Sequence, residues 1–598
     1  MLDVSATWQA ASRAKFRYQS YLTVKLEVVP PGIQDNTSVA SSQTFEQSTA
    51  ETIIDNSVEK PTSYATLEPN RWTLDGTYRL LSDSVSLPTW WSQKAVSVTK
   101  PSITFTFAQP YTIPGMYIVW DNESNSWPTS FKVTGYNASG TAVKTVTISD
   151  VNSVEGFFEA TAMDNVKKVT LQILTWNATN WKARVSEVTF GLFAKFESKN
   201  NGRISSAVVT DSVDPLARTL PVHTASVKLR NLDQYFDPTL TRGLSKHLAK
   251  QQLLKLQWHF VISPGNIESS PEVLYLIDDF SIPADSKEVQ INTTSRLANL
   301  TSEFIMGTYT GASRTLETIA QYVLSNSGAL LEEVGQTPWV VSEKLRDYTT
   351  TAPIPAMATN ALLQLIAAAS GTLLKTRATD GFIQFTNPAT EVSEYCAIEN
   401  AQALGDPELD IVDRLRSIRV GVYNYTVSSA TTEVGSAEYW LSGTNTVTIK
   451  YSKEFATDVS ATVTGATINS AQYYASYAVL NLKANSSGAT VTIKLQGKEI
   501  LKSVSYLATY NDTNVVNGVD VTVENPLVTT AIHAKSISEY VQAYYSKRVH
   551  STAKYLGYPQ LEAGDRISFA NTYGTSVVDV TSNKIDFNGA WNGTVEVV

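Results

Sequence analysis

The residues with the clearest binding chemistry are tryptophans gathered in one part of the chain. Residues 64 to 193 hold seven of the 12 tryptophans: Trp72, Trp90, Trp91, Trp120, Trp127, Trp176 and Trp181. A tryptophan in a β-domain usually packs in the core, but an indole ring exposed in a loop can stack on the apolar face of a sugar. Trp72 and Trp91 stand in strand-like sequence, which favours burial. Core packing and sugar contact both stay open for the loop residues Trp90, Trp127, Trp176 and Trp181.

Oxygen-bearing side chains suggest two further sites. The run DNESNS has the ligands to wrap a calcium ion through Asp121, Asn122 and Glu123, but it lacks the glycine and distal glutamate of an EF-hand loop. A polar loop without metal is the alternative. A glycosidase needs two carboxylates about 5 to 9.5 Å apart, and Asp278 with Asp279 is the obvious pair. Because adjacent strand residues point to opposite faces, we expect a structural role for this pair.

Other reaction chemistry lacks support in the sequence. The histidines lie in unlike segments without metal-ligand spacing: His223, His247, His259, His533 and His550. The chain has no G-x-S-x-G elbow, no Walker loop and no G-x-G-x-x-G fingerprint. We therefore expect a protein that is not an enzyme and carries no cofactor.

Charge and cysteine content exclude more classes. The net charge of −9 at pH 7, without a Lys/Arg stripe, argues against a nucleic-acid-binding site. The single cysteine, Cys396, excludes an intramolecular disulfide framework and a cysteine-based zinc site. The chain begins without the regions of a signal peptide, and no window approaches the ~18 apolar residues of a membrane span. We expect folding in a reducing cytoplasm.

The sequence predicts a mainly β fold with α/β parts, which must position these residues. The 598 residues suggest roughly three to five domains. Alternation of apolar and polar residues predicts strands at 22–28, 103–107, 169–173, 225–229 and 447–451. Helical spacing predicts helices at 316–324, 361–369 and 537–544, the second ended by Gly371. Asp380 and Gly381 predict a hairpin turn.

The tryptophan-rich segment resembles a discoidin domain, also called a coagulation factor 5/8 type C or galactose-binding-like domain. The resemblance is carried by WTLDG at 72–76, ITFTF at 103–107, IPGMYIVWD at 113–121 and ARVSEVTFG at 183–191. It implies a β-sandwich jelly roll that binds glycans or lipids through loops at one end. The terminal cysteine pair of the animal members is absent. On this basis the candidate carbohydrate-binding residues are Trp90, Trp127, Trp176, Trp181, Arg79, Asn122 and Asn180.

The surrounding chain resembles the tail-tip or baseplate hub proteins of tailed bacteriophages. The carrying motifs are SVKLRNLDQYFDP at 226–238, YLIDDF at 275–280 and PQLEAGDRI at 559–567, in the family's order. The resemblance implies two tandem barrel-like β-domains with peripheral α/β domains. It also implies a trimeric ring that adapts the tail tube to the tip.

Together these patterns predict six parts. The first hub β-domain is split between residues 1–35 and 195–310, because a linker at 36–63 and a discoidin-like jelly roll at 64–194 are inserted. A peripheral α/β domain at 311–410 follows. The second hub β-domain comprises 411–440 and 531–598, around an inserted β-rich domain at 441–530.

The predicted function is a structural hub of a phage tail tip that closes or adapts the tail tube and presents a glycan-binding module for host adsorption. The expected partners are two further copies in a homotrimer, distal tail and tail tube proteins, spike or fibre proteins, and a bacterial cell-wall glycan. The expected location is the distal end of the virion tail, after synthesis in the host cytoplasm. Two alternatives stay open: a secreted carbohydrate-active enzyme with a carbohydrate-binding domain, and a purely structural hub whose insert binds nothing.

Overall fold

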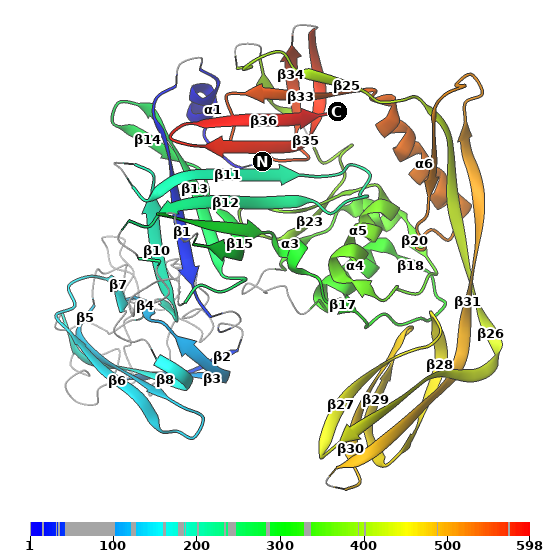
Figure 1. Cartoon of the computed structure of the whole chain (residues 1–598), viewed down its shortest axis with the longest axis horizontal. Coiled ribbons are helices and arrows are strands. Elements are labelled where there is room, and N and C mark those ends of the chain that lie inside the picture. Colours follow the sequence, from blue (N-terminus) through cyan, green and yellow to red (C-terminus); the bar gives the residue numbers. More distant parts are fainter. Residues whose placement is uncertain are drawn as a thin grey trace, which may run out of the picture.

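β-strands dominate the computed structural model, in agreement with the predicted fold class. It describes the chain apart from residues 1, 15–16, 31–32, 34–35, 42–101, 121–126, 159–162, 178–184, 186, 200–201, 233–234, 237–246, 283–286, 328–336, 393, 400–401, 487 and 572–573. Figure 1 shows a central body, a smaller β-sandwich at the lower left and a long arm at the right.

The body is one 14-stranded sheet made from both ends of the chain. Its main path runs through β10 (Leu192–Glu197), β1 (Ser20–Val28), β13 (Leu253–Ser263), β15 (Val273–Ser281), β16 (Glu288–Thr294), β12 (Val222–Arg230), β11 (Ile204–Ser212), β35 (Gly574–Phe587), β36 (Trp591–Val597), β33 (Val549–Tyr555) and β25 (Glu408–Ile411). Three strands lie beside this path: β14 (Asn266–Ser269), β24 (Glu394–Ile398) and β34 (Arg566–Asn571). The two expected hub β-domains are joined where β11 pairs with β35.

An aromatic cluster fills the junction between the two ends of the chain. The helix α1 (Ala6–Arg13) places Trp8, which is fully buried, against Phe260 and Trp591 at centroid distances of 5.7 and 6.2 Å. Trp258 meets Trp591 edge to face at 5.5 Å. Because offset and edge-to-face ring pairs add to the gain from area burial, this cluster holds the junction together.

The β-sandwich is connected to the body through two paired strands of the body. The strand β1, predicted at 22–28, pairs antiparallel with β10, and Val28 lies opposite Leu192 (Figure 1). One sheet of the sandwich contains β2 (Thr37–Ser41), β3 (Ser102–Ile113), β8 (Met163–Trp176), β5 (Pro128–Tyr136) and β6 (Ala142–Ser149); the other contains β7 (Glu155–Phe158), β4 (Met116–Val119) and β9 (Glu187–Thr189). Both sheets contribute to one apolar core.

The predicted linker needs a correction at its start. Residues 37–41 form β2, which pairs with β3 along its whole length, so the sandwich begins inside the segment predicted as a linker at 36–63. Val39 packs against the sandwich core. In the sequence it stands among Ser and Thr residues, so the strand was not recognised there. The remainder of that segment, 42–63, lies outside the described residues.

A small α/β part packs between the body and the arm. Its elements are α3 (Arg296–Asn299), β17 (Glu303–Phe304), β18 (Arg314–Thr315), α4 (Leu316–Ser325), β19 (Trp339–Val340), the 3-10 helix η5 (Glu343–Asp347), β20 (Thr349–Thr350), β21 (Met357–Ala358), α5 (Thr359–Ser370), β22 (Leu373–Thr376) and β23 (Ile383–Thr386). The predicted end of α5 is confirmed, because Gly371 adopts φ 60° as its C-cap. The predicted hairpin is confirmed by the pairing of β22 with β23.

The arm is built on a long two-stranded ribbon, β26 (Leu415–Leu441) with β31 (Ala489–Asn511), which belongs to a four-stranded sheet; a three-stranded sheet of β27 (Thr444–Lys450), β30 (Tyr477–Ala484) and β29 (Ala466–Tyr473) completes the arm. Its other strands are β28 (Ala456–Thr464) and β32 (Val519–Val523), and α6 (Ala531–Ser546) packs at its root. The strand β26 pairs with β31 over nearly its whole length. It therefore runs without a break through residue 440, where the sequence placed a domain boundary.

Candidate functional site

Two of the predicted sugar-binding tryptophans, Trp127 and Trp176, meet at one end of the sandwich. Trp127 directly precedes β5 and Trp176 is the last residue of β8, where it lies opposite Pro128. The backbone N–H of Trp127 donates to Oδ1 of Asn177 at 3.1 Å, and the N–H of Asn177 donates to the carbonyl of Trp127 at 3.0 Å. This exchange holds the two loops side by side, so both indoles are fixed at the same end.

Both rings are partly buried against the sandwich core. The ring of Trp176 meets the fully buried Trp120 edge to face, with centroids 6.2 Å apart. The indole N–H of Trp127 donates to the carbonyl of Val151 at 3.0 Å. Trp127 therefore offers a ligand its ring surface, because its N–H is already used within the protein. Such a pair suits stacking on a sugar better than hydrogen bonding to it.

The other predicted site residues lie outside the described residues. These are Trp90, Trp181, Arg79, Asn122 and Asn180, together with Asp121 and Glu123 of the calcium candidate, so both sites stay predictions. Within the described ranges, no group of three or more His, Cys, Asp or Glu side chains is arranged to hold a metal ion.

The adjacent carboxylates Asp278 and Asp279 lie at an irregularity of strand β15. A bulge in the pairing of β15 with β16 falls between Ile277 and Asp279, and both aspartates are exposed. Asp278 forms an exposed ion pair with Lys250 at 3.6 Å. The bulge breaks the alternation on which the expectation of opposite faces rested.

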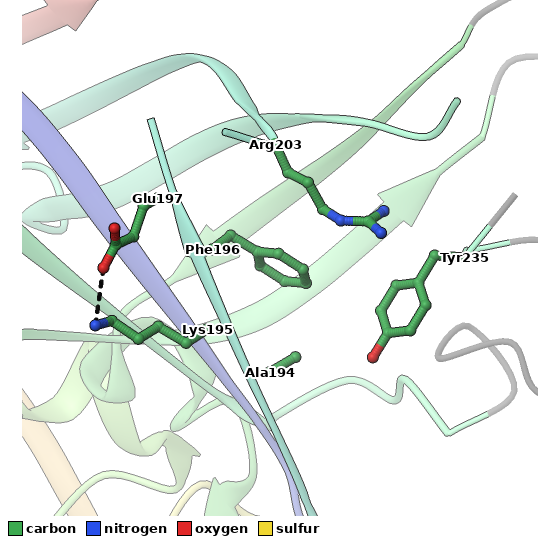
Figure 2. Close-up of a pocket in the computed structure, with 6 residues that line it drawn as sticks. All are labelled: Ala194, Lys195, Phe196, Glu197, Arg203 and Tyr235. Atoms are coloured by element: carbon green, nitrogen blue, oxygen red, sulfur yellow. Dashed lines mark ion pairs between the residues drawn. The ribbon is translucent and has the colours of Figure 1, made fainter. Parts of the chain in front are cut away.

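A polar hollow of about 370 Å³ lies where β10 leaves the sandwich for the body. Figure 2 shows its lining: Ala194, Lys195, Phe196, Glu197, Arg203 and Tyr235. Lys195 and Glu197 form an ion pair at 2.8 Å, and the guanidinium of Arg203 lies 4.8 Å from the ring centroid of Tyr235. Sequence reasoning did not single out this hollow, because its parts come from three segments that only the fold brings together.

One carboxylate in this lining has a shifted pKa. The hydrogen bond from Lys195 is the main influence that lowers the pKa of Glu197, so this carboxylate is ionised at neutral pH.

Comparisons with known proteins give only distant likenesses. No family model and no curated protein matches the sequence. Among solved structures, the 43 kDa tail protein of prophage MuSo2 from Shewanella oneidensis is 12% identical, with a TM-score of 0.37 over 66% of this chain and 94% of that one. A tail protein from Neisseria meningitidis is 10% identical, with a TM-score of 0.35 over 68% of this chain and 93% of that one. The family 32 carbohydrate-binding module of NanJ from C. perfringens, in complex with galactose, is 11% identical, with a TM-score of 0.18 over 28% of this chain and 99% of the module.

These scores are too low to assign a function. The described part of the chain also contains no helix of the length and apolarity that a membrane crossing requires.

Proposed function

We propose that this chain is a structural hub of a phage tail tip or baseplate, which closes or adapts the tail tube and presents a glycan-binding module to the host cell wall. The observation that carries the proposal is the pairing of β1 with β10 at the root of the sandwich. With this root, the module is an appendage on an edge of the body, and the body's own strands remain paired around it.

The body has the continuous sheet and the packed junction that a rigid hub requires. Its sheet joins both ends of the chain, and the cluster around Trp8 locks that junction. The order of the motifs at 226–238, 275–280 and 559–567 supports the same assignment, since their described parts fall on or beside strands of this sheet. A rigid body that carries peripheral modules suits a symmetric ring, in which weak sites gain avidity on a repeating polymer.

The proposed partners follow from this role. They are two further copies of the chain in a homotrimer, distal tail and tail tube proteins, spike or fibre proteins, and a bacterial cell-wall glycan. The proposed location is the distal end of the virion tail. The hub is not an enzyme in this proposal, and the hydrolysis of cell wall belongs to other proteins.

A second candidate is a purely structural hub whose sandwich binds no sugar. The specific observation in its favour is the use of Trp127 and Trp176 inside the protein, one through its N–H and the other through its contact with Trp120. In that case the two tryptophans serve only to join the loops to the core.

Removal of the sandwich separates the two candidates. Because Val28 lies opposite Leu192 in adjacent antiparallel strands, a short hairpin turn that joins these two residues replaces the sandwich without loss of the body's sheet. Glycan-array profiles of the full chain and of this shortened chain are then compared. The glycan-binding hub predicts signals that disappear with the sandwich. Identical profiles from the two chains, or a full chain that binds no glycan, would mean that the sandwich binds no sugar and would support the purely structural hub.

A further inference from the structure

The far end of the arm carries a flat polar face that no function has yet explained. Three of the four strands in this sheet, β28, β31 and β26, lie side by side there. The register places Trp440 opposite Thr490, Glu438 opposite Thr492, and Ser436 opposite Lys494. The next strand continues the rows with Thr464 and Thr462. At spacings of about 4.8 Å between strands, the three rows are about 10 Å wide.

The two faces of this sheet are clearly different. The residues between those rows point inward to the apolar core of the arm; they include Ala437, Tyr439, Val491, Ile493 and Leu495. The outward residues Ser436, Glu438, Thr462, Thr464 and Lys494 are exposed. The hydroxyl of Thr492 donates to Oε1 of Glu438 at 3.2 Å, so the neighbouring strands β31 and β26 are linked by a side-chain hydrogen bond on this face.

One aromatic ring stands on this polar face. Trp440 is 74% exposed, although the indole is among the largest apolar side chains in proteins. Its ring lies against the turn before β31, because a Cβ on Gly488 would come within 2.9 Å of its Cζ2 atom. The glycine, with φ 92°, lets the backbone pass beneath the ring. The ring is thus supported on one side and accessible from solvent.

This combination fits a neutral carbohydrate. A sugar ring needs one aromatic surface for its C–H groups and hydroxyl, amide or carboxylate groups at the side for its own hydroxyls. The face supplies Trp440 for the first need and Thr490, Thr492 and Glu438 for the second. The charged side chains in these rows, Glu438 beside the Trp440 row and Lys494 one row farther, have opposite signs, which favours an uncharged ligand over an anionic one.

A protein partner fits this face less well. Stable protein interfaces bury about 800 Å² on each side around a contiguous apolar core. Here the rows next to Trp440 consist of hydroxyl and charged side chains, so an interface core is lacking.

We propose that the outer face of β28, β31 and β26 binds neutral polysaccharide, with Trp440 as its stacking residue. This site is separate from the sandwich and stands whether or not the sandwich binds sugar. It lies on the part of the molecule that extends farthest from the body in Figure 1.

Affinity electrophoresis of the full chain tests the proposal. The chain is run through gels that contain dextran, galactan, mannan or xylan as neutral probes, and alginate as an anionic one. The variants are Trp440→Ala, Trp440→Tyr and the control Thr446→Ala. Thr446 is exposed on the second sheet of the arm, where its hydroxyl accepts a hydrogen bond from Asn481.

The expected result is retardation of the full chain by at least one neutral polysaccharide. Trp440→Ala weakens this binding roughly tenfold or more, as for the loss of a central aromatic anchor. Trp440→Tyr keeps part of the binding, and Thr446→Ala keeps all of it. The melting temperature of Trp440→Ala stays unchanged, since the side chain is mostly exposed.

The proposal is overturned by no retardation in any neutral gel, by equal retardation of the full chain and Trp440→Ala, or by a Trp440→Ala variant that loses self-association instead of polysaccharide binding. The shortened chain, in which a hairpin turn joins Val28 to Leu192, keeps the arm. Its continued retardation supports the arm site, and loss of all retardation in it assigns binding to the sandwich and overturns the arm site.

Discussion

In the body, Trp8, Trp258 and Trp591 are at most 3% exposed, whereas Trp440 in the arm is 74% exposed. The body uses its indoles to join strands from the two ends of the chain. The arm gains its stability from a long ladder of backbone hydrogen bonds and a small apolar core, and Trp440 lies outside that core. Tryptophan therefore holds strands together in the body and, as we propose, binds a ligand in the arm.

The largest loss of stability is expected from a change at Trp8, in the body. Trp8→Ala removes a fully buried indole that contacts Phe260 and Trp591, and its N–H donor to Gln560. We expect a loss of about 3–5 kcal/mol in the free energy of unfolding, as for other large-to-small changes in cores. Chemical denaturation checks this value. A loss below about 1 kcal/mol would show that the junction does not depend on α1.

A buried ion pair tests whether the α/β part is fastened to the body. The ammonium of Lys375 on β22 donates to Oε2 of Glu562 at 3.2 Å, and both side chains are nearly buried. Lys375→Met leaves the carboxylate without this cation and is expected to cost about 3 kcal/mol. The exposed Lys535, 3.9 Å from Glu539, supplies the control, and Lys535→Met should change stability by less than about 0.5 kcal/mol. Equal effects of the two changes contradict the prediction.

The body should also lose stability in acid through His259. Burial lowers the pKa of His259 to about 4 from its ordinary 6.5, against the opposing effect of Glu197. The ring bonds to Thr23 and Ser269. Because the folded pKa is depressed, this contribution is complete above pH 6.5 and is lost as the pH falls toward 4. At pH 5 the loss amounts to about 2 kcal/mol.

The measurement is the melting temperature between pH 7.5 and 4. His259→Gln should flatten the decrease below pH 6.5, since glutamine does not titrate. If the melting temperature of His259→Gln falls with pH as it does for the unchanged chain, groups other than His259 cause the loss of stability in acid.

The smallest stability effect is expected in the arm. Trp440→Ala should alter the free energy of unfolding by less than about 0.5 kcal/mol, because little indole surface is buried. Chemical denaturation of Trp440→Ala and Trp8→Ala side by side compares what a tryptophan contributes to stability in the arm and in the body. A Trp440→Ala variant as unstable as Trp8→Ala would make Trp440 a structural residue.

Local patterns in the sequence were sufficient to predict many elements. The alternation at 22–28 and 225–229 and the helix that ends before Gly371 were predicted correctly, because period and capping are local properties. The union of β11 with β35 was not predictable, since strand pairing across more than 350 residues leaves no local pattern. The ribbon of β26 was divided at residue 440 for a similar reason.

The candidate sites show the same limit. The role of Trp8 was missed because a short N-terminal helix has a weak pattern, and its partners lie far along the chain. A signal for Trp440 was present, since Ala437, Tyr439 and Leu441 alternate with the polar Ser436 and Glu438. That alternation puts Trp440 on the outer face.

In our proposal this chain is a hub from which binding modules project. Cryo-electron microscopy of phage particles that carry the chain tests this proposal most directly. We expect three copies in a ring at the distal end of the tail, with the 14-stranded bodies around the axis and the sandwiches and arms outside. Particles that lack the chain, or that carry it on the head or along the tail shaft, would contradict the proposal.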